Sequence, residues 1–151
     1  MTVARRIVET LGTRGDTLSV AESCTGGLIA AAVIAVPGAS RVFTEGLVVY
    51  ANEAKTARLG VPRDIIVRFG AVSHETVRAL IEGLSTPARI AVSGVAGPDG
   101  GSAEKPVGTV VLGASYRGRE QIVTRHFIGT RDEVRQAAAD AALELLEMLL
   151  D

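Results

Sequence analysis

Val20-Ala21-Glu22-Ser23-Cys24-Thr25-Gly26-Gly27 is the stretch from which the fold of this chain follows. An apolar run precedes it, and an apolar, alanine-rich segment over residues 28–36 comes directly after it. This order predicts a strand, a tight turn and a helix. The Ser23 hydroxyl and several free backbone N–H groups would then lie at a helix N-terminus, which attracts anions and stabilises developing negative charge.

Helical and strand patterns alternate outward from this turn. Asn52, Ser73 and Thr130 are expected as helix N-caps, and Arg117-Gly118 as a hairpin turn. Helices are predicted over about 2–13, 25–35, 52–60, 62–69, 73–84 and from 130 onward. Strands are predicted over about 17–22, 44–50, 89–92, 109–116 and 120–127.

This alternation predicts an α/β fold: a three-layer αβα sandwich around a mixed, mostly parallel sheet, with a C-terminal β-hairpin plus helix. The 151 residues are expected to form a single domain over 1–151. With 47% apolar residues, the chain is long enough to bury a core without disulfides.

The composition limits the classes of partner that the protein is expected to bind. Net charge is −1 and aromatic residues make up 3%, so neither a nucleic-acid partner nor an anionic membrane surface is expected. No apolar run reaches the length of a membrane span, and no signal-peptide core is present, so a cytoplasmic location is predicted. The apolar, aromatic-poor composition permits a homo-oligomer. Cys24 is the only cysteine, which excludes an internal disulfide.

Three polar segments each follow a predicted strand: 22–27, 50–55 and 93–105. If these strands are parallel, all three segments meet at the carboxyl edge of the sheet, where open α/β folds bind ligands. We therefore expect one site that combines them.

In the first segment, Ser23 has two interpretations. It is a nucleophile with neighbouring amides as an oxyanion hole, or Ser23 or Thr25 only caps a helix. Cys24 is a third option as the nucleophile, but a lone cysteine is more often buried and inert.

In the second segment, Lys55 is the candidate base. The two histidines, His74 and His126, fall in a helix start and a strand, so a Ser-His-Asp triad has little support. A lysine in the first turn of a helix has its ammonium form disfavoured by the helix dipole and by burial. Tyr50 is a candidate proton relay. The alternative is that Lys55 is a solvated surface lysine and Tyr50 a strand-end aromatic.

The third segment, 93–108, is rich in glycine. Its backbone amides can wrap a phosphate or another anion, and Lys105 can add positive charge. The alternative is a flexible surface loop. The chain shows no Cys/His cluster, so no metal and no cofactor are expected.

Taken together, 21–27, 46–60 with Tyr50-x-Asn52-Glu53-x-Lys55, Gly70-Ala71-Val72-Ser73 and 93–108 resemble the CinA C-terminal domain family, the nicotinamide-nucleotide amidases. The matching pieces occur in family order and span most of the chain. Ser93 stands where the family usually has threonine, which keeps the hydroxyl. The chain resembles the stand-alone amidase form, without the larger N-terminal domain of full-length CinA proteins.

The resemblance implies hydrolysis of nicotinamide mononucleotide to nicotinate mononucleotide and ammonia, a step of pyridine-nucleotide salvage. It implies Ser23 as the nucleophile, with Tyr50 and Lys55 as the base system and an arginine near the last helix, Arg131 or Arg135, as a substrate ligand. The residues expected to bind substrate are Glu22, Cys24, Thr25, Gly26, Gly27, Asn52, Ser93, Gly94, Ala96, Gly97, Gly101, Lys105 and Arg135. The alternative function is a non-catalytic nucleotide-binding or regulatory module that uses the same pocket.

Overall fold

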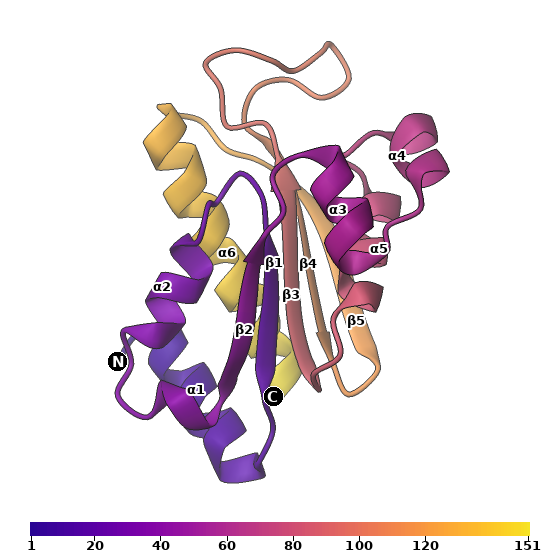
Figure 1. Cartoon of the computed structure of the whole chain (residues 1–151). Helices are drawn as coiled ribbons and strands as arrows, with labels where there is room; N and C mark the ends of the chain where they lie inside the picture. Colours follow the sequence, from indigo (N-terminus) through magenta and orange to yellow (C-terminus); the bar gives the residue numbers. More distant parts are fainter.

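The computed structural model describes all residues from 1 to 151. Figure 1 shows the elements in chain order. They are α1 Val3–Arg14, β1 Leu18–Glu22, α2 Leu28–Ile34, a 3-10 turn at Ala39–Arg41, β2 Phe43–Val48, α3 Asn52–Leu59, α4 Arg63–Phe69, α5 His74–Gly83, β3 Ala88–Gly94, β4 Thr109–Tyr116, β5 Arg119–His126 and α6 Arg131–Leu150.

The five strands form one mixed sheet in the order β2-β1-β3-β4-β5. Strand β1 pairs in parallel with β2 and with β3, whereas β4 pairs antiparallel with β3 and with β5. The three N-terminal strands therefore end at one edge, and β4 and β5 form the C-terminal hairpin. The predicted mixed α/β sheet is confirmed.

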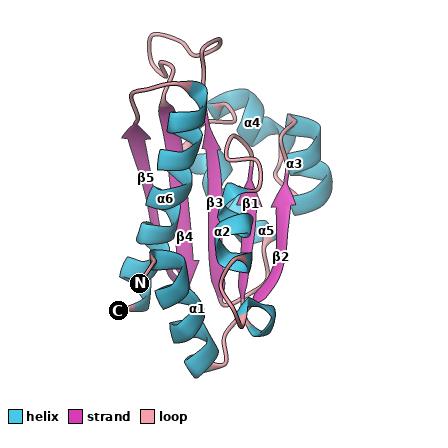
Figure 2. Cartoon of the chain, turned by 90° about the vertical axis from the view of Figure 1, so that its left-hand side faces the viewer, coloured by secondary structure: helices cyan, strands magenta, loops and turns pink.

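Helices cover both faces of the sheet (Figure 2). Helices α1, α2 and α6 pack on one face, where Leu18 and Val20 of β1 join the larger core. Helices α3, α4 and α5 pack on the other face, where Ala21 joins a smaller core. Because neighbouring residues of β1 enter opposite cores, the sheet lies between two helical layers, as predicted.

Two of the three predicted N-caps are confirmed. Ser73 accepts from the Thr76 N–H, and Thr130 forms a capping box with Glu133. The prediction for Asn52 is wrong: the cap of α3 is Ala51, which makes no side-chain cap bond, and Asn52 is the first helical residue.

Helix α2 also begins later than predicted. Gly26 and Gly27 have φ of 58° and 98°, which is left-handed backbone, so helical geometry starts only at Leu28. The hairpin between β4 and β5 is as predicted, with positive φ at Arg117 and Gly118.

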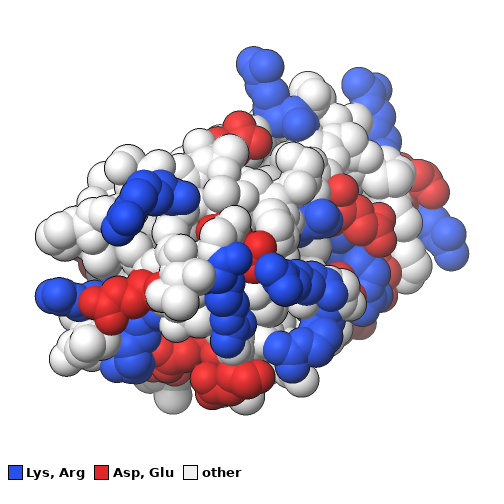
Figure 3. All heavy atoms as spheres, turned by 90° about the horizontal axis from the view of Figure 1, so that it is seen from below, with Lys and Arg blue, Asp and Glu red and all other residues white.

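The end of the molecule away from the carboxyl edge of β1 is shown in Figure 3. Acidic and basic side chains lie next to one another there, without an extended field of one sign. Asp16 and Arg117, for example, form an ion pair of 2.9 Å. None of the helices combines the length and the apolar character that crossing a bilayer demands.

Close packing of α5 on β4 depends on Gly113. A Cβ at this position would lie 2.6 Å from Val77 Cγ1 and 2.7 Å from Ile81 Cδ1. We expect Gly113→Val to lower the free energy of unfolding by about 1–3 kcal/mol, measured by urea denaturation. Gly12→Ala is the control, because its Cβ would lie 3.7 Å from Val42 and helix α1 should gain about 0.5–1 kcal/mol. Equal effects of the two substitutions would contradict this packing.

Candidate functional site

The three polar segments meet where β1, β2 and β3 end. These strands are parallel, so the turn after β1, the start of α3 and the glycine-rich loop after β3 share one edge of the sheet. In Figure 1 this is the upper end of the molecule, where the loop over residues 95–108 projects above the strands. The N-terminus of α6 completes the edge, because Arg131 contacts the loop and Arg135 contacts the turn.

Glu22 occupies the helix N-terminus that the sequence suggested was free for an anion. Its side chain is 1% exposed, Oε1 accepts from the Thr25 hydroxyl (2.6 Å) and the Ile29 N–H (3.1 Å), and Oε2 accepts from the Ala30 N–H (3.0 Å). Neither Ser23 nor Thr25 caps α2, whose N-cap residue is Gly27. The Glu22 carboxylate is therefore committed to the turn and to α2, an arrangement that the expectation of substrate contact did not include.

Ser23 lies at the start of the turn and is almost completely buried. Its hydroxyl donates weakly to the Val92 carbonyl, at 3.3 Å, and it accepts no hydrogen bond within the chain. Among residues 23–27 only the Gly26 N–H has an acceptor, the Ser23 carbonyl at 3.1 Å; the other four N–H groups have none within the chain. A reactive hydroxyl and unpaired amide donors are thus present within one turn, as an oxyanion hole requires.

Lys55 is a buried lysine without a carboxylate partner. Its side chain is 2% exposed, and Nζ donates to the backbone carbonyls of Val49 (3.0 Å) and Tyr50 (2.9 Å). Burial lowers the pKa of the Lys55 ammonium, and the neighbouring Cys24 and Glu53 offset only part of that effect. The interpretation of Lys55 as a solvated surface residue is wrong.

The strand register brings Lys55 beside the serine turn. Glu22 pairs with Val48, and the Val49 N–H donates to the Glu22 carbonyl at 2.8 Å. Ser23 and Val49 are therefore neighbours across the two strands, and the Lys55 ammonium binds the Val49 carbonyl. Lys55 thus lies near the serine turn with a lowered pKa, as the base of a Ser-Lys hydrolase requires. Its hydrogen bonds go to the Val49 and Tyr50 carbonyls, and none joins it to the Ser23 hydroxyl.

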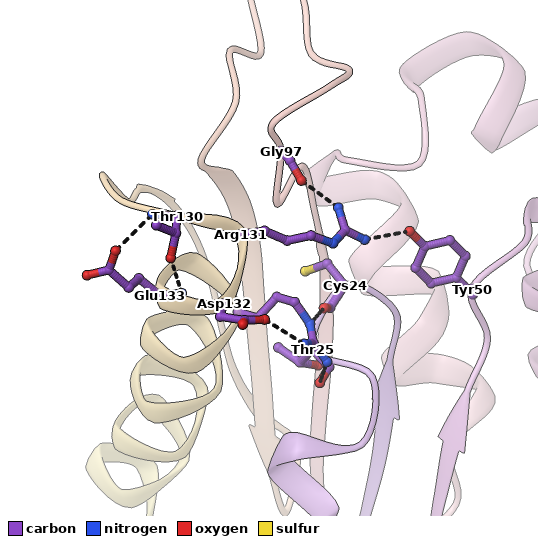
Figure 4. Close-up of polar contacts among 9 residues, drawn as sticks. Cys24, Thr25, Tyr50, Gly97, Thr130, Arg131, Asp132 and Glu133 are labelled. Carbon is purple, nitrogen blue, oxygen red and sulfur yellow. Dashed lines mark hydrogen bonds and ion pairs between the residues drawn. The ribbon is translucent and has the colours of Figure 1, made fainter.

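Tyr50 contacts this lysine only through its backbone. Its side chain is 64% exposed, and its hydroxyl accepts from Arg131 at 3.3 Å (Figure 4). Arg131 also donates to the Gly97 carbonyl at 2.6 Å, so it links Tyr50 to the glycine-rich loop. The structure thus directs the Tyr50 hydroxyl toward α6 and not toward the Lys55 ammonium.

Arg135 holds the turn itself. Its guanidinium donates to the carbonyls of Cys24 (2.9 Å) and Thr25 (3.3 Å), and it forms a 3.4 Å ion pair with Asp132. Gly26 permits this approach, because a Cβ there would lie 2.9 Å from the guanidinium. Arg131, one helical turn earlier, lies above the Cys24 sulfur and is the more exposed arginine (Figure 4). Arg135 therefore binds the turn, and Arg131 binds the glycine-rich loop and Tyr50. The role of either one as a substrate ligand stays a prediction.

Cys24 is a buried thiol. Its residue is 5% exposed, and burial raises the pKa of its thiol to about 11. Little thiolate exists near neutral pH at such a value, and the thiolate is the nucleophilic form. Ser23 is accordingly the better candidate nucleophile of the two.

The glycine-rich loop leaves the sheet through residues that pack closely. Gly94 pairs with Val110, and a Cβ on it would lie 2.7 Å from that side chain. Ala96 is buried in the larger core, so its side chain is not available to a ligand. Gly97 and Gly101 have positive φ and shape the bends of the loop, and the Gly97 carbonyl is already bound by Arg131.

Lys105 lies on the α4–α5 side of this loop. Its ammonium donates to the Phe69 carbonyl at 2.7 Å, at the end of α4. It lines a cavity of about 390 Å³ that also includes His74, Glu75, Thr109 and Val111. A wider cavity of about 810 Å³ lies between α1, α2 and α6, and its lining includes none of the predicted catalytic residues.

The cavity beside Lys105 was missed at the sequence level. Ser73, His74 and Glu75 at the start of α5 line it. The available signal was the segment Gly70–Ser73, which is part of the family resemblance but was not predicted to bind substrate. Ser93 is 2% exposed and pairs with Val111 of this lining, whereas Asn52 is exposed and lies beside a separate small cavity with Arg63.

Comparisons with known proteins identify the family to which the chain belongs. The sequence profile of the CinA C-terminal domain matches residues 1–150. A "CinA-like protein" of Anaeromyxobacter sp. (strain K) is 45% identical over 148 residues, which cover 95% of this chain and 36% of the relative. A "CinA-like protein" of Kosmotoga olearia is 42% identical, with 95% and 36% covered. The chain thus spans about a third of the length of these curated relatives.

Solved structures show the same fold. The competence/damage inducible protein CihA from Agrobacterium tumefaciens has a TM-score of 0.93 and 42% identity, covering 98% of this chain and 93% of that one. A CinA superfamily protein from Escherichia coli has a TM-score of 0.91 and 28% identity, covering 98% and 87%. From the profile match, these relatives and the shared fold, the chain belongs to the CinA C-terminal domain family.

Proposed function

We propose that this protein hydrolyses the carboxamide of nicotinamide mononucleotide, releasing nicotinate mononucleotide and ammonia. The observation that carries the proposal is the buried Lys55 ammonium, without a carboxylate partner, beside the Ser23 turn. Burying a cation without a counter-ion costs stability, and a functional site is where such a cost is expected. The choice of substrate rests on the family resemblance.

The reaction divides into two acyl transfers. The Ser23 oxygen forms a bond to the carboxamide carbon while its proton passes to neutral Lys55, and the carbonyl oxygen becomes an anion facing the free amides of the turn. Collapse of this intermediate breaks the C–N bond, and the proton on Lys55 leaves with ammonia. Water then attacks the acyl-serine, again with Lys55 as base, and restores the Ser23 hydroxyl. No metal or other cofactor enters these steps.

We infer that the rest of the substrate lies on the same face of the sheet. Ala21 pairs with Ala91, so Ser23 and Ser93 follow two residues later on neighbouring strands, and Ser93 pairs with Val111 of the 390 Å³ cavity. Two strand spacings amount to about 10 Å, a span comparable to the length of a mononucleotide. In this pose Lys105 and His74 offer donors to the phosphate, and Glu75 offers an acceptor to ribose hydroxyls.

Substitution of the two reactive groups tests the mechanism. Ser23→Ala should lower kcat at least about 10³-fold because the nucleophile is lost, and Lys55→Met about 10²–10⁴-fold because the base is lost. The measurement is ammonia release from nicotinamide mononucleotide. Lys105→Met is the matched lysine variant and should mainly raise KM.

Two results would count against this mechanism. One is wild-type turnover in both Ser23→Ala and Lys55→Met. The other is calorimetric binding of nicotinamide mononucleotide by the wild-type protein with no product over hours, which would favour the non-catalytic binding module.

The pH dependence of kcat/KM should follow Lys55. The base is the neutral amine, and burial lowers the pKa of Lys55 from 10.5. Activity should therefore rise with pH up to a plateau that begins below 10.5, and fall as acid returns the proton to Lys55. A rate that declines with rising pH over this range, in protein that remains folded by circular dichroism, would exclude Lys55 as the base.

Tyr50→Phe separates direct proton transfer from a tyrosine relay. Phenylalanine keeps the backbone carbonyl that binds Lys55 and removes only the hydroxyl that faces Arg131. We expect kcat to change less than about 5-fold, because loss of a proton-transfer group costs about 10²–10⁴-fold. A loss in that larger range, measured by ammonia release, would restore Tyr50 as the relay.

A further inference from the structure

Glu22 is a buried carboxylate next to the proposed nucleophile, and it forms none of the ion pairs of the structure. Its partners are the Thr25 hydroxyl and the backbone N–H groups of Ile29 and Ala30. Desolvation of an ionised carboxylate is unfavourable unless strong hydrogen bonds replace its water. All three contacts are hydrogen bonds donated to the carboxylate. Their donors lie in the turn and the helix that follow Ser23.

These contacts tie Glu22, at the start of the turn, to Thr25 and to the start of α2, and so close the turn into a hydrogen-bonded ring. The carboxylate bonds the second and third residues of α2, the donors that an N-cap side chain usually satisfies one at a time. The carbonyl of the same residue accepts from Val49 of β2. One residue therefore fixes the end of β1, its neighbour β2 and the start of α2 relative to one another.

Arg135 holds the opposite side of the ring through the carbonyls of Cys24 and Thr25. In a planar trans peptide the carbonyl and the following N–H point in opposite directions, so the Thr25 N–H points away from Arg135. The N–H groups of Ser23, Cys24, Thr25 and Gly27 are the donors of the turn left without an acceptor in the chain. The turn held by Glu22 and Arg135 thus presents unpaired backbone N–H donors beside Ser23.

We propose that Glu22 is the positioning residue of the oxyanion-binding turn. Its hydrogen bonds keep the free amides oriented before the substrate arrives, and such preorganised donors stabilise charge that develops in the transition state. Glu22 itself touches neither the substrate nor the reacting atoms. This role rests on the proposed amidase function.

Glu22→Gln tests the role with almost no change of shape. The new amide group would direct an N–H toward one of the donors that the carboxylate now accepts from, so the turn loses at least one bond. We expect kcat for ammonia release to fall about 10–100-fold with KM within about 3-fold, in protein that melts as one folded species. Glu22→Asp keeps the charge with a shorter reach and should lose less activity than Glu22→Gln.

Glu45→Gln is the matched control, because Glu45 is an exposed carboxylate on β2 and makes no hydrogen bond or ion pair. We expect wild-type kcat and KM from it. A loss of kcat in Glu22→Gln that merely equals the loss of folded protein would reduce Glu22 to a structural role and overturn the proposal. Unchanged kcat with a raised KM would also overturn it, since Glu22 would then act in substrate binding.

Labelling of Ser23 with a fluorophosphonate separates this proposal from the amidase function. The probe needs an activated serine and an oxyanion hole but no amide substrate. We expect Ser23 of the wild-type protein to be labelled, and Glu22→Gln to slow labelling about 10–100-fold. Labelling without ammonia release would refute the amidase function. The ratio of the wild-type labelling rate to that of Glu22→Gln would still test the positioning role of Glu22. Equal labelling rates, or no labelling of folded wild-type protein, would overturn the positioning role.

Discussion

The two hydrogen bonds from Lys55 to the carbonyls of Val49 and Tyr50 join the first turn of α3 to the end of β2, next to the serine turn. Because the pKa of Lys55 is lower in the folded protein than in the unfolded chain, the unfolded chain holds the extra proton between the two values. The contribution of Lys55 to stability therefore rises with pH across that window. Folding therefore favours the neutral form of the Lys55 amine, which is the form that the proposed reaction uses as its base.

Around this lysine the charged groups divide into two kinds. Glu22 and Arg135 have their hydrogen bonds committed to the turn, one through N–H groups and the other through carbonyls. Arg131 and Lys105 each bind one carbonyl of another segment and retain further donors. The first pair holds the turn. Of the second pair, Lys105 lines the 390 Å³ cavity, and Arg131 links the glycine-rich loop to Tyr50.

The sequence predicted what depends on local pattern, namely the alternation of elements, the caps at Ser73 and Thr130 and the turn at Arg117-Gly118. It did not predict what depends on distant contacts. The Glu22 side chain reaches helix N–H groups seven and eight residues later, which no capping pattern anticipates. Arg131 and Arg135 lie on one face of α6, so spacing alone does not show which of them the turn binds.

The most direct test of this account is the titration of Lys55 by NMR, following its side-chain ¹³Cε and ¹⁵Nζ shifts. The chain contains only two lysines, so a single Lys105→Met variant leaves Lys55 as the one lysine signal. The account predicts a midpoint clearly below 10.5 in the folded protein, in the direction that burial imposes. A midpoint at or above 10.5 would contradict it, because the amine would then stay protonated and could not act as the base.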